Sequence, residues 1–336
     1  MTDTTEASAT AYRCPFCRTT SAGTDANCPT CGAPVDIKLR TTTSGWTEIP
    51  PVADMAKIQL GQTSCQISGR LVPVAEFALA AGDSVYFPHS SMLWQEEAVK
   101  LDSMSMRKGW TRMRAGLPLI MLTASGPGRI AFSHDTAGEM IAVPLQPGQA
   151  VDVRENQMVV ASSEVTYDWV DSGVWFTTMG DGRGGSGGND QSSGMKLLKM
   201  GLDVAGAPGG DAGRDQRQEI EYHYPLGQYL DRFSATDKPG AIFVQSGGNS
   251  FMRDLAEGEQ IMVKPPALLY KDTSVGLQMH VEFPHAGMKL WRSWGNRYLW
   301  LRLWGPGRVA LQSSYDRLED PGTDFREACR YTQQAW

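Results

Sequence analysis

The chain has 336 residues, of which 41% are hydrophobic, and its 37 acidic and 31 basic residues give a net charge of −6. This acidic balance excludes the general attraction to phosphate that characterises most binders of nucleic acids and anionic membranes, so any such contact would need a local patch. The 36 glycines and 19 prolines favour a β-rich chain with many turns.

The N-terminal sequence MTDTTEASAT has no basic start and no apolar stretch, unlike a secretory signal. No segment approaches the roughly 18 uninterrupted apolar residues of a transmembrane helix. We therefore expect a cytoplasmic protein without a transmembrane segment, and peripheral membrane association stays open. The expected organisation is a disordered tail (1–12), a zinc ribbon (13–36), a linker (37–56) and a β-domain (57–336) that contains a glycine-rich flexible insertion (180–217).

Four of the six cysteines form two C-x-x-C pairs near the N-terminus, Cys14 with Cys17 and Cys28 with Cys31. Two such pairs can supply four thiolates to one tetrahedral ion, and a closed all-sulfur shell suits structural zinc rather than catalysis. We therefore expect one structural Zn²⁺ per chain, with rubredoxin-like iron or disulfides as alternatives. Because a segment this short has no room for a core, metal binding would supply nearly all of its folding energy.

Two segments lack the periodicity of helices or strands. The segment LRTTTSGWTEIPPVAD (39–54) is rich in Thr, Ser, Gly and Pro, which predicts the linker. The segment from 180 to 217 is so rich in Gly, Ser and Asp that it cannot repay its ordering entropy, which predicts the flexible insertion.

Three segments of the β-domain align without a gap, starting at Gly82, Gly148 and Gly258. In each, apolar residues occur 3, 5, 10, 11 and 17 positions after the glycine. Alternation at every second residue is the strand period. Each segment therefore predicts a glycine turn with positive φ, a strand, a short turn and a second strand.

A second repeated turn, G-P-G-R, occurs at 126–129 and 305–308, each time between two apolar runs. We expect its counterpart in the middle of the chain to be the turn at Gly247 and Gly248. Both repeats indicate three related β-units that use related hairpins.

The succession of G-P-G-R turns and glycine-led strand pairs resembles the family named for altered inheritance of mitochondria protein 24, over about residues 57–336. That family is grouped with folds like the tryptophan RNA-binding attenuation protein. The resemblance implies an all-β fold of three pseudo-repeated lobes, each a β-sandwich or short double-stranded β-helix, with pseudo-threefold symmetry. It implies no catalytic residues, and the zinc ribbon and the glycine-rich insertion are additions to the family pattern.

The strand at 298–304 is the most informative candidate for a binding surface. Strand alternation sends Leu299, Leu301 and Leu303 to one face, where they can fill the core. The opposite face then carries an aromatic and basic stripe that could bind a protein, stack single-stranded bases or pack within the chain. This stripe consists of Tyr298, Trp300, Arg302 and Trp304.

Other chemistry-bearing patterns are weaker. A formal G-x-G-x-x-G has no helix to hold a pyrophosphate, and two His-containing pairs are adjacent in sequence, which does not build a catalytic triad. Three residues of MHVEFPH could share a metal in a cupin-like site, although a proline interrupts the strand. The glycine motif is formed by Gly182, Gly184 and Gly187, and the adjacent pairs are His89 with Ser90 and His134 with Asp135. The possible cupin-like ligands are His280, Glu282 and His285.

The pattern as a whole predicts a non-enzymatic scaffold or adaptor that binds protein partners or itself, because strong structural repetition coincides with no convergent reactive group. The alternative is a single-stranded RNA-binding module that uses strand 298–304, although the acidic charge disfavours nucleic acid. A cupin-like metalloenzyme is the least favoured class.

Overall fold

A computed structural model describes residues 12–21, 27–33, 42, 44–49, 55–104, 121–179, 220–282, 298–315 and 325–328. Within these ranges the chain forms strands and two 3₁₀ turns, η1 (His89–Ser91) and η2 (Pro265–Ala267), so the all-β expectation is confirmed. No helix of this part of the chain is long and apolar enough to cross a membrane. The glycine-rich segment 180–217 and the tail 1–11 lie outside the described residues.

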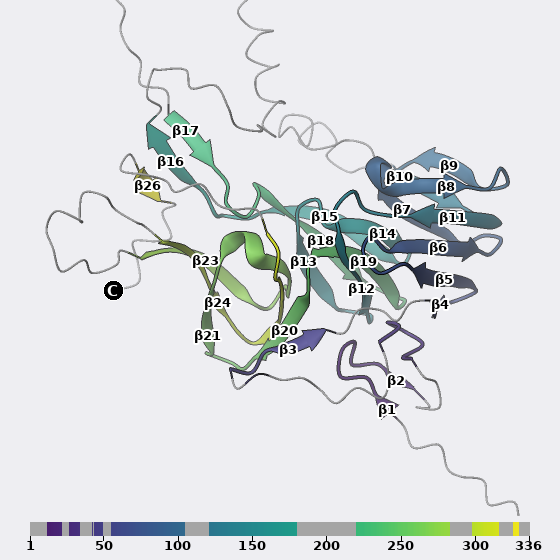
Figure 1. Cartoon of the computed structure of the whole chain (residues 1–336), viewed down its shortest axis with the longest axis horizontal. Coiled ribbons are helices and arrows are strands. Elements are labelled where there is room, and N and C mark those ends of the chain that lie inside the picture. Colours follow the sequence, from purple (N-terminus) through teal and green to yellow (C-terminus); the bar gives the residue numbers. More distant parts are fainter. Residues whose placement is uncertain are drawn as a thin grey trace, which may run out of the picture.

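Three units of six strands each make up most of the structure (Figure 1). Unit 1 comprises β6 (Val74–Leu79), β7 (Ser84–Pro88), β8 (Met92–Gln95), β9 (Lys100–Ser103), β10 (Met121–Ser125) and β11 (Gly128–Phe132). Unit 2 comprises β12 (Gly138–Leu145), β13 (Ala150–Arg154), β14 (Met158–Ser162), β15 (Val165–Asp171), β18 (Tyr229–Ala235) and β19 (Gly240–Gly247). Unit 3 comprises β20 (Ser250–Leu255), β21 (Gln260–Val263), β22 (Leu268–Asp272), β23 (Gly276–Glu282), β24 (Tyr298–Trp304) and β25 (Gly307–Gln312).

The strands of each unit pair in the same way. The fifth strand lies between the second and the fourth, and the sixth lies between the first and the third, always antiparallel. The pairing of the third strand with the sixth has a register shift in all three units. This agreement confirms that the glycine-led repeat marks three equivalent β-units.

The repeated glycines have two different physical causes. Gly82, Gly148 and Gly258 have φ of +88°, +82° and +76°, and a Cβ on any of them would meet no atom within 4 Å. The backbone conformation alone therefore selects glycine at these turns.

The glycine that opens the sixth strand is selected by close packing in every unit, and Gly128 and Gly307 also have φ of +141°. A Cβ at this position would lie 2.6 to 2.8 Å from Cγ2 of the valine 17 residues after the turn glycine, which is too close for any side chain. The valine at this spacing therefore packs on the same glycine in every unit. The three pairs are Gly128 with Val99, Gly240 with Val165, and Gly307 with Val275.

This register corrects one prediction. The middle counterpart of the G-P-G-R turn is not at Gly247 and Gly248, because Gly247 ends β19 and Gly248 follows it, whereas the G-P-G-R turn precedes the sixth strand. Ile242 pairs with Ala161 as Ile130 pairs with Gln95, and each partner lies 13 residues after the turn glycine of its unit. Ile242 is therefore equivalent to Ile130, and the counterpart of the turn is the segment Lys238-Pro239-Gly240. The local match of glycines was misleading because both ends of one strand carry glycine.

Strand pairing joins the three units in a row. The third strand of unit 2 pairs with the second strand of unit 1, β14 with β7, and the third strand of unit 3 pairs in the same way with the second strand of unit 2, β22 with β13. Figure 1 shows the units in this order along the long axis, with unit 1 at the right and unit 3 at the left. We call the two contacts junction 1 and junction 2.

Further strands extend the row at its edges. The hairpin of β4 (Ala56–Leu60) and β5 (Thr63–Ser68) adds to β6, and β3 (Thr47–Ile49) adds to β20. Part of the segment predicted as a linker, 37–56, is therefore a strand of unit 3's sheet. A small separate sheet consists of β16 (Phe176–Met179), β17 (Ile220–His223) and β26 (Phe325–Ala328), and the ribbon contains β1 (Tyr12–Arg13) and β2 (Thr20–Ser21).

The core runs through junction 1. Phe77 and Phe132 of unit 1 lie edge-on with ring centroids 5.6 Å apart, and Phe77 meets Phe243 of unit 2 at 5.3 Å. A second apolar cluster fills unit 3 and includes the three leucines of β24. Neighbouring units therefore share buried side chains as well as strand pairs.

Candidate functional site

Two equivalent turns bring the four ribbon cysteines together. The fourth residue after each first cysteine donates its N–H to that cysteine's carbonyl, Arg18 to Cys14 at 2.9 Å and Gly32 to Cys28 at 2.8 Å. Both donors have positive φ, +63° and +73°. Glycine adopts this conformation without cost, whereas an arginine here is uncommon and points to another role for its side chain.

The sulfur atoms are spaced as a tetrahedral metal ion requires. Cys14 Sγ lies 3.8 Å from Cys31 Sγ, and Cys17 Sγ lies 3.7 Å from Cys28 Sγ. All four lie within 4.8 Å of one another, and none forms a disulfide. A tetrahedron with metal–sulfur bonds of about 2.3 Å has edges of about 3.8 Å. The four cysteines can therefore hold one metal ion.

Ionisation of one cysteine thiol affects the pKa values of the other three, and a bound cation would offset the repulsion between the thiolates. Hydrogen bonding with Cys17 lowers the pKa of Cys14 to about 7, and hydrogen bonding with Cys14 lowers the pKa of Cys28. The same contacts with Cys14 raise the pKa of Cys17 and of Cys31. Four thiolates at this spacing repel one another, so full ionisation requires a bound positive ion.

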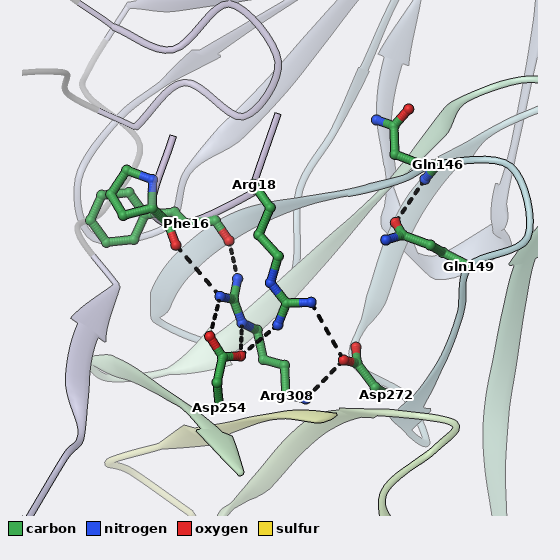
Figure 2. A network of polar contacts seen from close by, with 8 residues as sticks. Phe16, Arg18, Gln146, Gln149, Asp254, Asp272 and Arg308 are labelled. Atoms are coloured by element: carbon green, nitrogen blue, oxygen red, sulfur yellow. Dashed lines mark hydrogen bonds and ion pairs between the residues drawn. The ribbon is translucent and has the colours of Figure 1, made fainter. Parts of the chain in front are cut away.

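A network of arginines and aspartates connects the ribbon to unit 3 (Figure 2). Arg308, on β25, donates from Nε and Nη2 to the two carboxylate oxygens of Asp254, both at 2.8 Å. The same guanidinium donates to the carbonyl of Phe16 in the ribbon. Arg18 pairs with Asp254 and reaches Asp272 at 3.7 Å. The ribbon arginine with positive φ is thus an anchor to the β-domain.

Electrostatics favour this network. Burial by itself raises the pKa of the Asp254 carboxyl, but the hydrogen bonds and charges of Arg308 and Arg18 outweigh burial and lower the pKa below its ordinary value. Asp254 therefore stays ionised at neutral pH and bridges two guanidinium groups. Sequence reasoning missed this network, although the repeated arginine of the G-P-G-R turn was a signal for it.

The ribbon makes unit 3 different from unit 1. The side chain of Arg308 is 8% exposed beneath the ribbon, whereas that of its counterpart Arg129 is 60% exposed. A cavity of about 280 Å³ lies between the ribbon and the β-domain, with Phe16 and Arg18 on one side and Ile141 and Tyr270 on the other. The ribbon closes one side of this cavity.

The aromatic strand β24 alternates as predicted. Leu299, Leu301 and Leu303 are buried, while Trp300 and Arg302 are half-buried on the other face and Trp304 is exposed. The side chain of Tyr298 lies outside the described part of the structure.

Contacts hold the aromatic face in place. Trp300 Nε1 donates to Glu282 Oε2 at 2.9 Å, and Lys264 Nζ lies 4.7 Å from the centroid of the Trp300 ring. Trp304 covers the backbone of Gly276. These contacts within the chain fix the orientation of both indole rings.

The remaining sequence candidates are not brought together. Among the described residues, the four cysteines are the one group of three or more metal-ligating side chains. Glu282 is bonded to Trp300, while His285 and the glycines at 182, 184 and 187 lie outside the described residues. His134 hydrogen-bonds to Thr136 and lies 3.0 Å from Asp135 in an exposed turn.

These observations define a class: a β-protein of three repeated units with a four-cysteine ribbon docked on the third. The sequence profile of the family described as Mitochondrial biogenesis AIM24 matches residues 65–195 and 228–314. The match covers more than half of the chain, so the protein belongs to the AIM24 family, which confirms the resemblance seen in the sequence. The match leaves the ribbon outside.

One solved structure similar to this chain is that of protein SPYM3_0169 from Streptococcus pyogenes. It shares 14% sequence identity with a TM-score of 0.48, and the similarity covers 76% of this chain and 94% of that one. No curated protein matches the chain in sequence.

Proposed function

We propose that this protein is a non-enzymatic scaffold or adaptor, in which the β-domain offers a protein-binding surface and a structural Zn²⁺ holds the ribbon on unit 3. The observation that carries the proposal is the outward face of the sheet β21–β24–β23, where Trp300, Arg302 and Trp304 lie beside Met262. Trp304 is 37% exposed and Met262 is 42% exposed.

Such a face has the composition of a binding hot spot. Tryptophan and arginine dominate the energetics of protein interfaces because they combine large apolar area with directional polar contacts. The contacts of Trp300 with Glu282 and Lys264 reduce the ordering entropy that a partner would otherwise have to overcome.

Zinc is the metal that best fits the ribbon. Four thiolates favour a soft or borderline ion with tetrahedral geometry, and a closed shell of four cysteines is typical of structural zinc. Its role in this proposal is to fold the ribbon, so that Arg18 and the carbonyl of Phe16 reach Asp254 and Arg308.

The test is cross-linking mass spectrometry in the native host with the wild type and with Trp300→Ala/Trp304→Ala. We expect cross-links between unit 3 and a partner protein to be lost in the double variant. Leu71→Ala removes an equally apolar exposed side chain from a loop and is the matched control. Unchanged cross-links in the tryptophan variant would contradict the proposal.

A second candidate, binding of single-stranded RNA, is favoured by the basic groups Lys264 and Arg302 beside Trp300. Aromatic platforms with nearby cations stack bases without sequence preference. Titration of labelled RNA at about 50 and about 200 mM salt separates the two candidates, because phosphate contacts weaken steeply with salt. Absence of binding at the lower salt removes this candidate.

We propose a cytoplasmic location, supported by the four unpaired cysteines, since clustered thiols are typical of reducing compartments. The family name refers to mitochondria, so cell fractionation should include them. Recovery of the chain in a mitochondrial or membrane fraction would contradict this location.

A further inference from the structure

The two junctions inside the chain use one register. Tyr86 of β7 pairs with Ala161 of β14 at junction 1, and Asp152 of β13 pairs with Lys271 of β22 at junction 2. In both, the fourth residue after the turn glycine of one unit faces the thirteenth residue after the turn glycine of the next. The second and third strands of a unit are therefore complementary connectors.

One connector of each kind is left over at the ends of the row. Among the described residues, β8 of unit 1 pairs with β11 alone, and β21 of unit 3 pairs with β24 alone. Their counterparts in the other units each have a strand on both sides. The fourth strands, β9, β15 and β23, are edge strands in all three units. An unpaired edge there is therefore common to every unit and does not indicate a missing neighbour.

Apolar side chains are exposed at β8. Leu93 is 56% exposed and Trp94 is 40% exposed, whereas their counterparts in β14, Val159 and Val160, are fully buried. The counterparts in β22 are at most 5% exposed. The same positions are thus core residues wherever the next unit is present.

The edge of β21 shows the same contrast. Met262 is 42% exposed, whereas its counterparts Tyr86 and Asp152 are 4% and 2% exposed within junctions 1 and 2. An exposed strand edge with apolar side chains is a template for pairing with another chain.

The two leftover strands cannot meet within one chain as it is folded, because they lie at opposite ends of the row (Figure 1). We propose that copies of this chain join head to tail, with β8 of one copy paired antiparallel to β21 of the next in the register of the internal junctions. Gln95 of one copy then faces Met262 of the other, and Leu93 becomes buried. The occupant of each edge is a second copy, since the chain itself contains two examples of the contact.

Such a contact is heterologous, so a pair of copies still has one unused connector of each kind, β21 on one copy and β8 on the other. Repetition therefore produces a closed ring or an open filament, depending on the rotation between copies. The inference rests on the proposed scaffold role and deepens it by naming one partner, but it uses the strand edge of unit 3 rather than the tryptophans of β24.

Disulfide trapping tests the register. In a Cys329→Ser background, one preparation carries Gln95→Cys and the other carries Met262→Cys. Directly paired strand residues have Cα atoms about 4.5–5.5 Å apart, within disulfide reach. We expect a covalent dimer in the mixture under mild oxidation and none in either preparation alone. Gln278→Cys, on β23 and three strands from β8 in the proposed sheet, replaces Met262→Cys as the control and gives no dimer.

Mixing of edge variants tests the polarity. Leu93→Glu blocks β8 and Met262→Glu blocks β21, so each variant alone should be monomeric by light scattering after size exclusion. Their equimolar mixture should form dimers through the two intact edges. Leu71→Glu, in a loop, should assemble as the wild type does. Circular dichroism confirms that each variant is folded.

Three results would overturn the inference: a wild type that stays monomeric at every concentration, edge variants that assemble like the wild type, or a covalent dimer in a preparation that carries only one of the two engineered cysteines. None of these results touches the proposed partner binding, because that proposal is tested by the tryptophan variant. Unchanged partner cross-links in the tryptophan variant, together with intact assembly, would contradict the proposed function and leave this inference standing.

Discussion

Asp152 at junction 2 offers a sharp test of how the units are held together. Its carboxylate is 2% exposed and accepts from Lys271 Nζ at 2.9 Å and from Arg232 Nε and Nη2 at 2.6 and 3.0 Å. Lys271 is itself buried. At junction 1 the same two positions hold Tyr86 and Ala161, so only junction 2 has a charged pair at these positions.

Asp152→Asn removes the negative charge and leaves the Lys271 ammonium buried with two carbonyl partners, of Val275 at 2.9 Å and of Asp272 at 3.5 Å. Breaking a buried ion pair by removing one partner costs about 3–5 kcal/mol. Because a domain has a total stability of only about 5–15 kcal/mol, this loss should be a large fraction of the free energy of unfolding.

Lys271→Met is the informative comparison. It leaves Asp152 paired with Arg232, so we expect a smaller loss than for Asp152→Asn. The double variant should lose less than the sum of the single variants, with a coupling energy of about 1–3 kcal/mol. Urea unfolding of all four proteins measures these values. A loss below about 1 kcal/mol for Asp152→Asn, or a larger loss for Lys271→Met than for Asp152→Asn, would contradict this account of junction 2.

The pH dependence follows from the same contacts. Burial raises the pKa of Asp152, but hydrogen bonds from Arg232 and the charge of Lys271 outweigh it and lower the pKa below its ordinary 3.8. A carboxyl with a lowered pKa in the folded state stabilises the protein at neutral pH. This contribution is lost as the pH falls below about 4, and the loss should be smaller in Asp152→Asn when unfolding is followed against pH.

Three further predictions concern the ribbon, the glycines and a buried thiol. Chelation should remove one metal ion per chain by elemental analysis and unfold the ribbon while the strand signal in circular dichroism persists; coincident loss of both would contradict a separate ribbon. Gly307→Ala should destabilise the protein more than Gly148→Ala in thermal unfolding, by at least about 1 kcal/mol. Both positions have a positive φ, but only at position 307 does the new methyl group also collide with Val275. Equal losses would argue against the packing explanation. Cys65 is fully buried and burial raises its pKa, so it should resist alkylation in the native state and react after unfolding, as mass spectrometry can show.

The sequence predicted the three units well, because a few residues close together in the chain define the turns and strands of each unit. The turn glycine and the apolar residues that follow it set the strand period, and the valine 17 positions later packs on the glycine that opens the sixth strand. The spacing of the two C-x-x-C pairs likewise predicted the four-cysteine cluster. The turn at Gly247 was assigned wrongly because a glycine pair alone does not say which end of a strand it occupies.

The arrangement of the units could not be predicted in the same way. Repetition shows that the units are alike, but the pairing of β7 with β14 and of β13 with β22 depends on residues far apart in the chain. The short strand β3 has only three residues, too few for a period to show. The anchor formed by Arg18 and Arg308 joins opposite ends of the chain, and no local pattern carries that information.

The contact between Arg308 and Phe16 spans 292 positions of sequence. On the ribosome, the cysteine segment leaves the exit tunnel long before its docking site on unit 3, because Asp254 follows Arg18 by 236 positions. The segment can therefore bind its metal and fold before Asp254 has been synthesised. A messenger shortened before the codon for Asp254 should therefore yield nascent chains with a formed but undocked ribbon.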